Sequence, residues 1–116
     1  MRRSEIRIVD FSDAVGSEAA RTRPVVIVSN DGDNSSAGRL GRGVIAVVPV
    51  TSNTERVYPF QVLLRSVDTG LDSDSKAQAE QVKSVSVERV GRMIGIVDCE
   101  HMTRLDNALR LHLALD

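Results

Sequence analysis

Two runs of β-branched residues dominate the hydrophobic pattern of the chain. Residues 25–28 read Val-Val-Ile-Val, and residues 44–51 read Val-Ile-Ala-Val-Val-Pro-Val-Thr. Unbroken runs of this kind are typical of strands that are buried on both faces. We predict a buried strand at 25–28 and a central strand at 44–51. Pro49 requires a free edge or a bulge there, because proline has no N–H to donate.

Shorter segments also have strand character. Ile6, Ile8 and Val9 predict a first strand with Arg7 on the opposite face, because successive side chains of a strand alternate. Further strands are expected at 60–64, 79–87 and 93–97. The polar segments between them predict a long loop at 11–23, a turn cluster at 30–36 leading into a short helix at 36–40, and a turn at 71–76.

The last part of the chain has a helical period. Apolar residues recur every three or four positions between 98 and 115, at Met102, Leu105, Leu109 and Leu113. This spacing predicts an amphipathic helix with Asp98 as its N-cap. The pattern as a whole predicts a mainly β (α+β) fold, in which a small curled antiparallel sheet of five to seven strands is closed by one C-terminal helix. A chain of 116 residues has room for one domain, 1–116, and no second core.

Composition narrows the candidate chemistry. The net charge of −1 gives no bulk attraction to nucleic acid or membranes. Lys76 and Lys83 are the two lysines among fifteen basic residues, so thirteen are arginine, which suits bidentate phosphate contacts; a GC-rich genome would give the same bias. Aromatic residues are scarce, which leaves few platforms for stacked bases. No apolar segment reaches membrane-spanning length, so we expect a cytoplasmic protein without membrane contact.

The residues that commonly carry catalysis are few. His101 and His112 lie on the predicted helix about 16 Å apart, too far to act together. Cys99 is the single cysteine, and with His101 it has no further metal ligands nearby in sequence, so no metal or other cofactor is expected. Arginine, hydroxyls and carboxylates at strand ends remain, a set that stabilises a charged phosphorane-like transition state. Arg23 precedes Pro24, which stiffens its backbone, although a solvated surface charge is the simpler interpretation of Arg23 alone.

With these segments in order, the chain resembles the MazF/PemK family of toxin endoribonucleases, in particular its mycobacterial or actinobacterial members. The resemblance spans nearly the full length, and the leucine-rich terminal helix agrees with it. Four blocks carry the resemblance: Gly16-Ser17-Glu18 through Arg23-Pro24-Val25-Val26, then Val48-Pro49-Val50-Thr51-Ser52, then Tyr58-Pro59-Phe60-Gln61-Val62, and then Ala79-Glu80-Gln81-Val82-Lys83-Ser84.

The resemblance implies an SH3-like barrel, a homodimer and the toxin component of a type II toxin-antitoxin system. It implies metal-independent, sequence-specific cleavage of single-stranded RNA by 2′-hydroxyl attack, with mRNA as substrate and rRNA or tRNA as alternatives. A cognate antitoxin with a disordered tail would neutralise the toxin. The implied catalytic residues are Arg23, Thr51 and Glu18. The residues expected to contact RNA are Ser17, Arg21, Ser52, Asn53, Gln81 and Lys83.

The chain departs from the family pattern near its start. It reads Ser4-Glu5-Ile6-Arg7 where the family has Gly-Glu/Asp-Ile-Trp/Tyr, and Asp13 stands where proline is frequent. The missing aromatic at Arg7 removes apolar surface from a region where family dimers and antitoxins make contact.

Two other functions stay open at this point. One is a toxin of the same fold that binds and poisons a topoisomerase without cutting RNA, and the other is a non-catalytic RNA- or protein-binding barrel. Both would leave Arg23 and Thr51 with structural roles.

Overall fold

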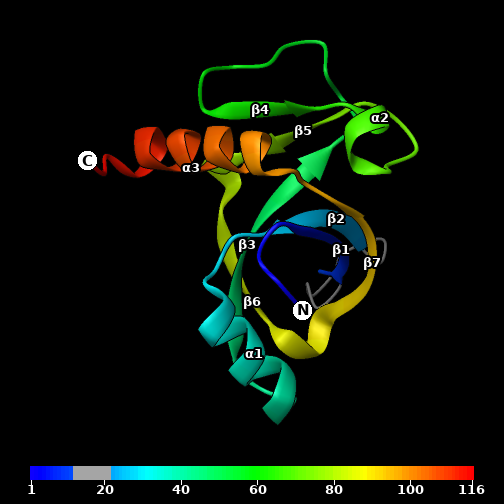
Figure 1. Ribbon diagram of the computed structural model, residues 1–116, viewed down its shortest axis with the longest axis vertical. Coiled ribbons are helices and arrows are strands. Elements are labelled where there is room, and N and C mark those ends of the chain that lie inside the picture. The colour runs from blue at the N-terminus through cyan, green and yellow to red at the C-terminus, as the bar shows by residue number, and fades with distance from the viewer. Residues whose placement is uncertain (12–21) are drawn as a thin grey trace, which may run out of the picture.

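Seven strands form one curled, open antiparallel sheet in residues 1–11 and 22–116, which are the residues that the computed structural model describes (Figure 1). The strand order is β4-β5-β3-β2-β1-β7, and β6 pairs with β3 beside this path. The expected fold class, a curled sheet with a C-terminal helix, is confirmed. The strands are β1 (Glu5–Asp10), β2 (Thr22–Ile27), β3 (Val44–Thr51), β4 (Gln61–Leu64), β5 (Ser75–Gln78), β6 (Lys83–Ser86) and β7 (Val90–Ile96). The helices are α1 (Asp31–Leu40), α2 (Ser66–Thr69), α3 (Cys99–Leu113) and two 3₁₀ turns, η1 (Ala79–Gln81) and η2 (Val87–Arg89).

β3 is the central strand and changes its partner partway along. On one edge it pairs with β2 from Val47 to Pro49. On the other edge it pairs with β6 up to Val47 and with β5 from Val50 onward. That edge carries no strand partner at Pro49, which is where a residue without an N–H is tolerated. The prediction of a central strand with a free edge at Pro49 is confirmed.

Both faces of β2 and β3 are buried, as their β-branched runs predict. Val26, Val48 and Val50 face a cluster that α3 covers with Met102, Leu105 and Ala108. Val25, Ile27 and Val47 face a second cluster, which includes Ala37 of α1. The alternation of neighbouring residues between the two clusters follows from the two-residue period of a strand.

The prediction of a turn cluster at 30–36 is wrong. These residues belong to α1, because the Asn30 side chain caps the helix by accepting a hydrogen bond from the Asp33 N–H at 2.8 Å. Asn34 is completely buried, where its amide donates to the Ser29 carbonyl at 2.9 Å. Asn and Asp favour caps and turns equally, so the sequence alone placed the start of this helix too late.

The segments expected at 71–76 and 79–87 also need correction. α2 was not predicted, and Ser75 and Lys76 belong to β5 rather than to a turn. The single strand expected at 79–87 is divided into η1, β6 and η2. Before η1 the chain forms β5, which pairs with the end of β3, and after η1 it forms β6, which pairs with the first part of β3. Because η1 makes the connection between these two pairings, the segment is not one continuous strand.

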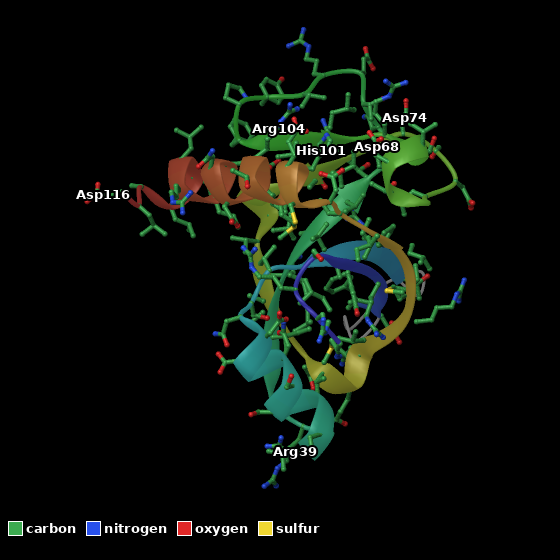
Figure 2. All side chains as sticks on the ribbon, viewed as in Figure 1. Arg39, Asp68, Asp74, His101, Arg104 and Asp116 are labelled. Carbon is green, nitrogen blue, oxygen red and sulfur yellow. The ribbon has the colours of Figure 1, made fainter. Side chains whose placement is uncertain are left out.

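α3 follows the prediction closely. Asp98 caps it, accepting a hydrogen bond from the His101 backbone N–H at 2.9 Å. Among the described residues, no helix has both the length and the apolar character needed to cross a bilayer. Figure 2 shows Arg39 at the free end of α1 and Asp116 at the C-terminus, both extending away from the sheet.

Candidate functional site

A cleft of about 360 Å³ opens where β2 begins and β3 ends. Arg23 contributes its cation, and Thr51 and Ser52 contribute hydroxyl groups. Thr22, Ser73 and Ser75 add three further hydroxyls to the wall. The cleft is therefore rich in hydrogen-bond donors around one guanidinium, which suits an anionic, oxygen-rich ligand.

The register of the sheet explains why Arg23 and Thr51 meet. The pairing of β2 with β3 ends at Val25 and Pro49, and Arg23 and Thr51 each lie two residues beyond that pair, so their side chains leave the same face of the sheet. This face is the one that Val25, Ile27 and Val47 bury in the second core cluster. Arg23 and Thr51 thus extend a buried face to the point where it reaches solvent.

The backbone at Arg23 is fixed from two sides. Arg23 pairs with Val9 of β1, and Pro24 pairs with Ile8. Proline holds its own φ and confines the preceding residue to extended conformations. The side chain of Arg23 is exposed, although its backbone lies in the sheet. This combination places a rigidly based guanidinium at the cleft mouth.

The Thr51 hydroxyl is held by the turn that follows it. Its oxygen accepts a hydrogen bond from the Asn53 backbone N–H at 3.2 Å. The Asn53 side-chain oxygen in turn accepts from the Glu55 N–H at 3.2 Å. A hydroxyl that accepts from the backbone still has its own proton to donate, and in the described part of the chain this proton has no acceptor. It can therefore donate to a ligand in the cleft.

A second hollow of about 370 Å³ adjoins the cleft and shares Arg23 with it. Phe11, Pro49 and Lys83 complete its lining. Lys83 lies opposite Val47 in the β3–β6 pair, on the same face of β3 as Pro49 and Thr51. Its ammonium stands 5.0 Å from the centre of the Phe11 ring. Arg23 therefore shares this hollow with a second cation, Lys83.

The structure places the remaining predicted site residues at different positions relative to the cleft. Ser52 lines the cleft, whereas Asn53 lies one residue further along, in the loop beyond it. Gln81 is exposed on η1 and lines neither the cleft nor the Lys83 hollow. Ser17, Glu18 and Arg21 lie outside the described residues.

The structure adds one wall that the sequence did not suggest. Leu71, Asp72, Ser73 and Ser75 line the cleft opposite Arg23. This wall is braced by Asp74, whose carboxylate accepts a hydrogen bond from the Ser66 N–H at 2.8 Å. That bond holds the pKa of Asp74 below its usual value. No local motif marks these residues, because they reach the cleft only through the pairing of β5 with the end of β3.

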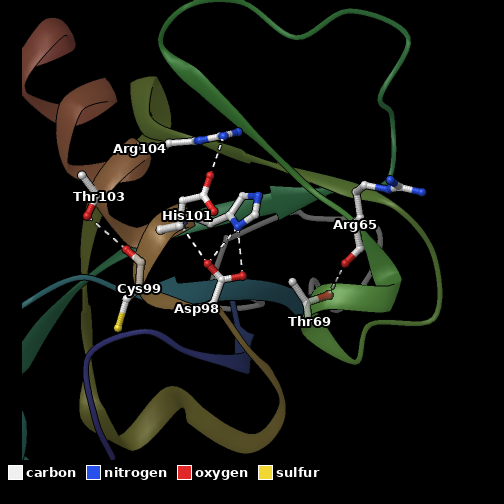
Figure 3. A network of polar contacts seen from close by, with 8 residues as sticks. Arg65, Thr69, Asp98, Cys99, His101, Thr103 and Arg104 are labelled. Carbon is white, nitrogen blue, oxygen red and sulfur yellow. Dashed lines mark hydrogen bonds and ion pairs between the residues drawn. The ribbon is translucent and has the colours of Figure 1, made fainter.

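The histidine at the start of α3 belongs to a separate network (Figure 3). His101 Nδ1 lies 2.9 Å from both carboxylate oxygens of Asp98, and Arg104 donates to Glu100 at 2.7 Å. The hydrogen bond from the His101 backbone N–H, followed by that with its side chain, lowers the pKa of Asp98. Within residues 1–11 and 22–116 no group of three or more His, Cys, Asp or Glu side chains could hold a metal ion.

Comparisons with known proteins agree with the resemblance seen in the sequence. The family model described as PemK-like, MazF-like toxin of type II toxin-antitoxin system matches residues 2–113. Endoribonuclease MazF9 of Mycobacterium tuberculosis is 59% identical over 115 residues, covering 99% of this chain and 98% of that protein.

Solved structures show the same fold. An endoribonuclease in complex with its cognate antitoxin, from a mycobacterial species, aligns with a TM-score of 0.77 at 22% identity, covering 100% of this chain and 97% of that one. A MazE–MazF crystal structure from Deinococcus radiodurans aligns with a TM-score of 0.80 at 19% identity, again covering 100% and 97%. The family model and the close mycobacterial relative both span nearly the whole chain, and the chain belongs to the PemK-like, MazF-like toxins of type II toxin-antitoxin systems.

Proposed function

We propose that this toxin is a metal-independent, sequence-specific endoribonuclease that acts on single-stranded RNA, with mRNA as the principal substrate. One observation carries the proposal: the Arg23 guanidinium and the Thr51 hydroxyl line the same cleft, to which four further serine and threonine residues contribute. The 59% identity to an endoribonuclease over nearly the whole chain supports it.

The cleft suits transphosphorylation within the RNA strand. The 2′-oxygen of a ribose attacks its own 3′-phosphorus, so the substrate supplies the nucleophile. The new bond joins O2′ to phosphorus, and the bond from phosphorus to the 5′-oxygen of the next nucleotide breaks. The 2′-hydroxyl loses its proton, and the departing 5′-oxygen gains one. The products carry a 2′,3′-cyclic phosphate and a 5′-hydroxyl.

Arg23 and Thr51 have complementary roles in this reaction. The guanidinium pairs in two-pronged fashion with non-bridging phosphate oxygens and neutralises the charge that develops on them. The Thr51 hydroxyl donates its free proton to the same group and fixes the orientation of the phosphate. Arginine stays protonated at neutral pH, so its role is electrostatic rather than that of a proton donor. Glu18 completes the catalytic set by resemblance and remains a prediction.

The test uses a single-stranded RNA that the protein cuts at one site, incubated in EDTA. A 2′-deoxy sugar at the cleaved position should abolish cleavage and leave binding intact, because the attacking group is gone. The matched control has the 2′-deoxy sugar one position away and should be cut normally. A 5′-phosphate on the downstream fragment would overturn the mechanism. No cleavage of any RNA would favour a toxin that poisons a topoisomerase or a non-catalytic binding barrel.

We further propose two protein partners. A cognate antitoxin with an acidic, partly apolar disordered segment would cover Arg23, since the exposed cation and its neighbour Lys83 attract such a segment. A second copy of this chain would form a homodimer, because a small domain with exposed apolar side chains such as Met93 and Ile96 gains by covering them with a self-complementary surface.

A further inference from the structure

The loop that joins β3 to β4, residues 52–60, carries a pair of stacked aromatic rings. The ring centres of Tyr58 and Phe60 are 5.3 Å apart and their planes differ by 2°. Tyr58 remains 43% exposed. These are two of the three aromatic residues in the whole chain. Phe60 stacks against Tyr58, and the exposed part of Tyr58 offers a flat apolar surface to solvent.

Two buried polar side chains hold this loop in place. Lys76, only 7% exposed, donates a hydrogen bond from its ammonium to the Arg56 carbonyl at 2.6 Å. Gln61, 8% exposed, accepts from the Tyr58 N–H at 3.1 Å and donates to Glu80 at 2.7 Å. The backbone is thus anchored just before and at Tyr58. An aromatic ring on an anchored backbone loses little conformational entropy when it binds a ligand.

A hollow of about 330 Å³ lies beside the Tyr58 ring. Asn53, Glu55, Arg56 and Lys76 complete its lining. Its rim therefore offers donors from an amide and a guanidinium, and acceptors from a carboxylate, beside a flat ring. This combination matches a nucleobase, which has two π-faces and an edge of mixed donors and acceptors.

Two residues that line the hollow, Lys76 and Asn53, are direct neighbours of Thr51 in the cleft. Lys76 lies directly opposite Thr51 in the β3–β5 pair, so both side chains leave the same face of the sheet. Asn53 lines the hollow and donates its backbone N–H to the Thr51 hydroxyl. A strand whose phosphate occupies the cleft can therefore place a neighbouring base over Tyr58.

We propose that Tyr58 is the stacking platform of a nucleobase subsite for the RNA strand, beside the scissile phosphate. The inference rests on the proposed RNA-cleaving function and adds a residue that determines how the substrate is gripped. Tyr58 acts on binding and positioning and takes no part in the bond-breaking step. Stacking depends on the ring and not on its hydroxyl, which accepts a hydrogen bond from the Arg56 guanidinium at 3.5 Å.

The chain contains its own probe for this subsite. Tyr58 is the sole tyrosine and the chain has no tryptophan, so tyrosine emission reports this ring alone. The Thr51→Ala variant should be titrated with a single-stranded RNA that the wild type cleaves. Base stacking on Tyr58 should quench the emission along a saturable curve. Duplex RNA of the same sequence, whose bases are already stacked and paired, should quench far less.

Substitution separates the ring from its hydroxyl. Tyr58→Ala should raise KM by about 5- to 150-fold, the range measured for loss of one base–aromatic stack, with a smaller change in kcat. Tyr58→Phe should keep the wild-type KM. Val57→Ala is the matched control, because Val57 is an exposed residue of the same loop that does not line the hollow. Circular dichroism of all three variants should match the wild type.

The outcomes distinguish this inference from the function on which it rests. Saturable quenching by RNA supports the subsite even if no RNA is ever cleaved, in which case the proposed nuclease activity falls alone. If the wild type cleaves RNA but neither quenching nor a rise in KM for Tyr58→Ala is found, the subsite is wrong and the nuclease stands. Quenching by an acidic peptide but not by RNA would also overturn it, since the ring would then serve a protein partner.

Discussion

Arg23 and Thr51 each lie two residues beyond the Val25–Pro49 pair, so one buried sheet face delivers both side chains to the same cleft. The two residues are far apart in sequence but line the same cleft. Neither residue is part of the hydrophobic core, yet each is held by a neighbour that is. The positions are therefore rigid while the functional groups remain accessible.

Removal of either group should abolish RNA cleavage. Arg23→Ala loses the charge, and Arg23→Lys keeps the charge but loses the planar fork, so we expect no detectable cleavage in the first and at least a tenfold loss in the second. Thr51→Val should be inactive, whereas Thr51→Ser, which keeps the hydroxyl, should retain activity. Initial rates on one RNA substrate measure all four.

The control for these variants is stability. Arg23 is exposed, so Arg23→Ala should change the free energy of unfolding by no more than about 0.5 kcal/mol. Arg39→Ala, at the free end of α1, should leave both the rate and the stability unchanged (Figure 2). Normal cleavage by Arg23→Ala would remove this arginine from the mechanism.

An antitoxin segment and RNA should compete for the Arg23 surface. We expect a peptide from the cognate antitoxin, rich in acidic and apolar residues, to displace an uncleavable 2′-deoxy-substituted RNA, and RNA to displace the peptide. Fluorescence anisotropy with each partner labelled in turn measures both directions. Simultaneous binding of the two would show that the antitoxin inhibits from elsewhere on the molecule.

Light scattering of the free protein at micromolar concentration should give the mass of a dimer.

Gly95 should tolerate no side chain. A Cβ there would lie 2.6 Å from the Thr69 carbonyl oxygen, so β7 and α2 would have to separate. We expect Gly95→Ala to destabilise the fold by about 1–3 kcal/mol in urea denaturation. Gly38→Ala is the matched control within α1, where a Cβ meets only the Met1 side chain at 3.7 Å. That change should stabilise the protein by about 0.5–1 kcal/mol, because alanine favours helix over glycine.

The Asp98 cap should give α3 a pH dependence. The folded pKa of Asp98 is lowered, first by the hydrogen bond from the His101 N–H. Its stabilisation is therefore present above the unfolded pKa of about 4 and is lost as the pH falls through the folded value. Asp98→Asn keeps an oxygen for capping but cannot ionise. The melting temperature of the wild type should exceed that of Asp98→Asn at pH about 5 and converge with it toward pH about 2.

Periodic segments were predictable, and segments defined by distant contacts were not. The β-branched runs and the leucine spacing of α3 correspond to the elements observed, because burial on both faces of a strand or one face of a helix leaves a mark in sequence. α1 was misplaced, since Asn30 and its neighbours fit a turn as well as a cap. The division of 79–87 follows from the partner change of β3, which no local pattern encodes.

The candidate site divides along the same line. Arg23, Thr51 and Ser52 were named from the sequence, and the structure brings them to one cleft. Asp72 and Ser73 were not predicted as site residues, because they form the opposite wall only when β5 pairs with β3. Gln81 lies apart from that cleft, and the residues before Thr22 that were assigned to the site stay predictions.

The partner change of β3 also affects when the protein becomes active during its synthesis. The N-terminal half of the chain contains both Arg23 and Thr51, but β3 receives β5 and β6 on its second edge only after those later segments leave the ribosome. Domains complete themselves as units, and long-range strand pairing is slow. A nascent chain therefore holds the two key residues without the wall that encloses them. For a nuclease that cuts mRNA, this means that the transcript still being translated meets a cleft that is not yet assembled. The enzyme becomes active only after most of its own message has been translated.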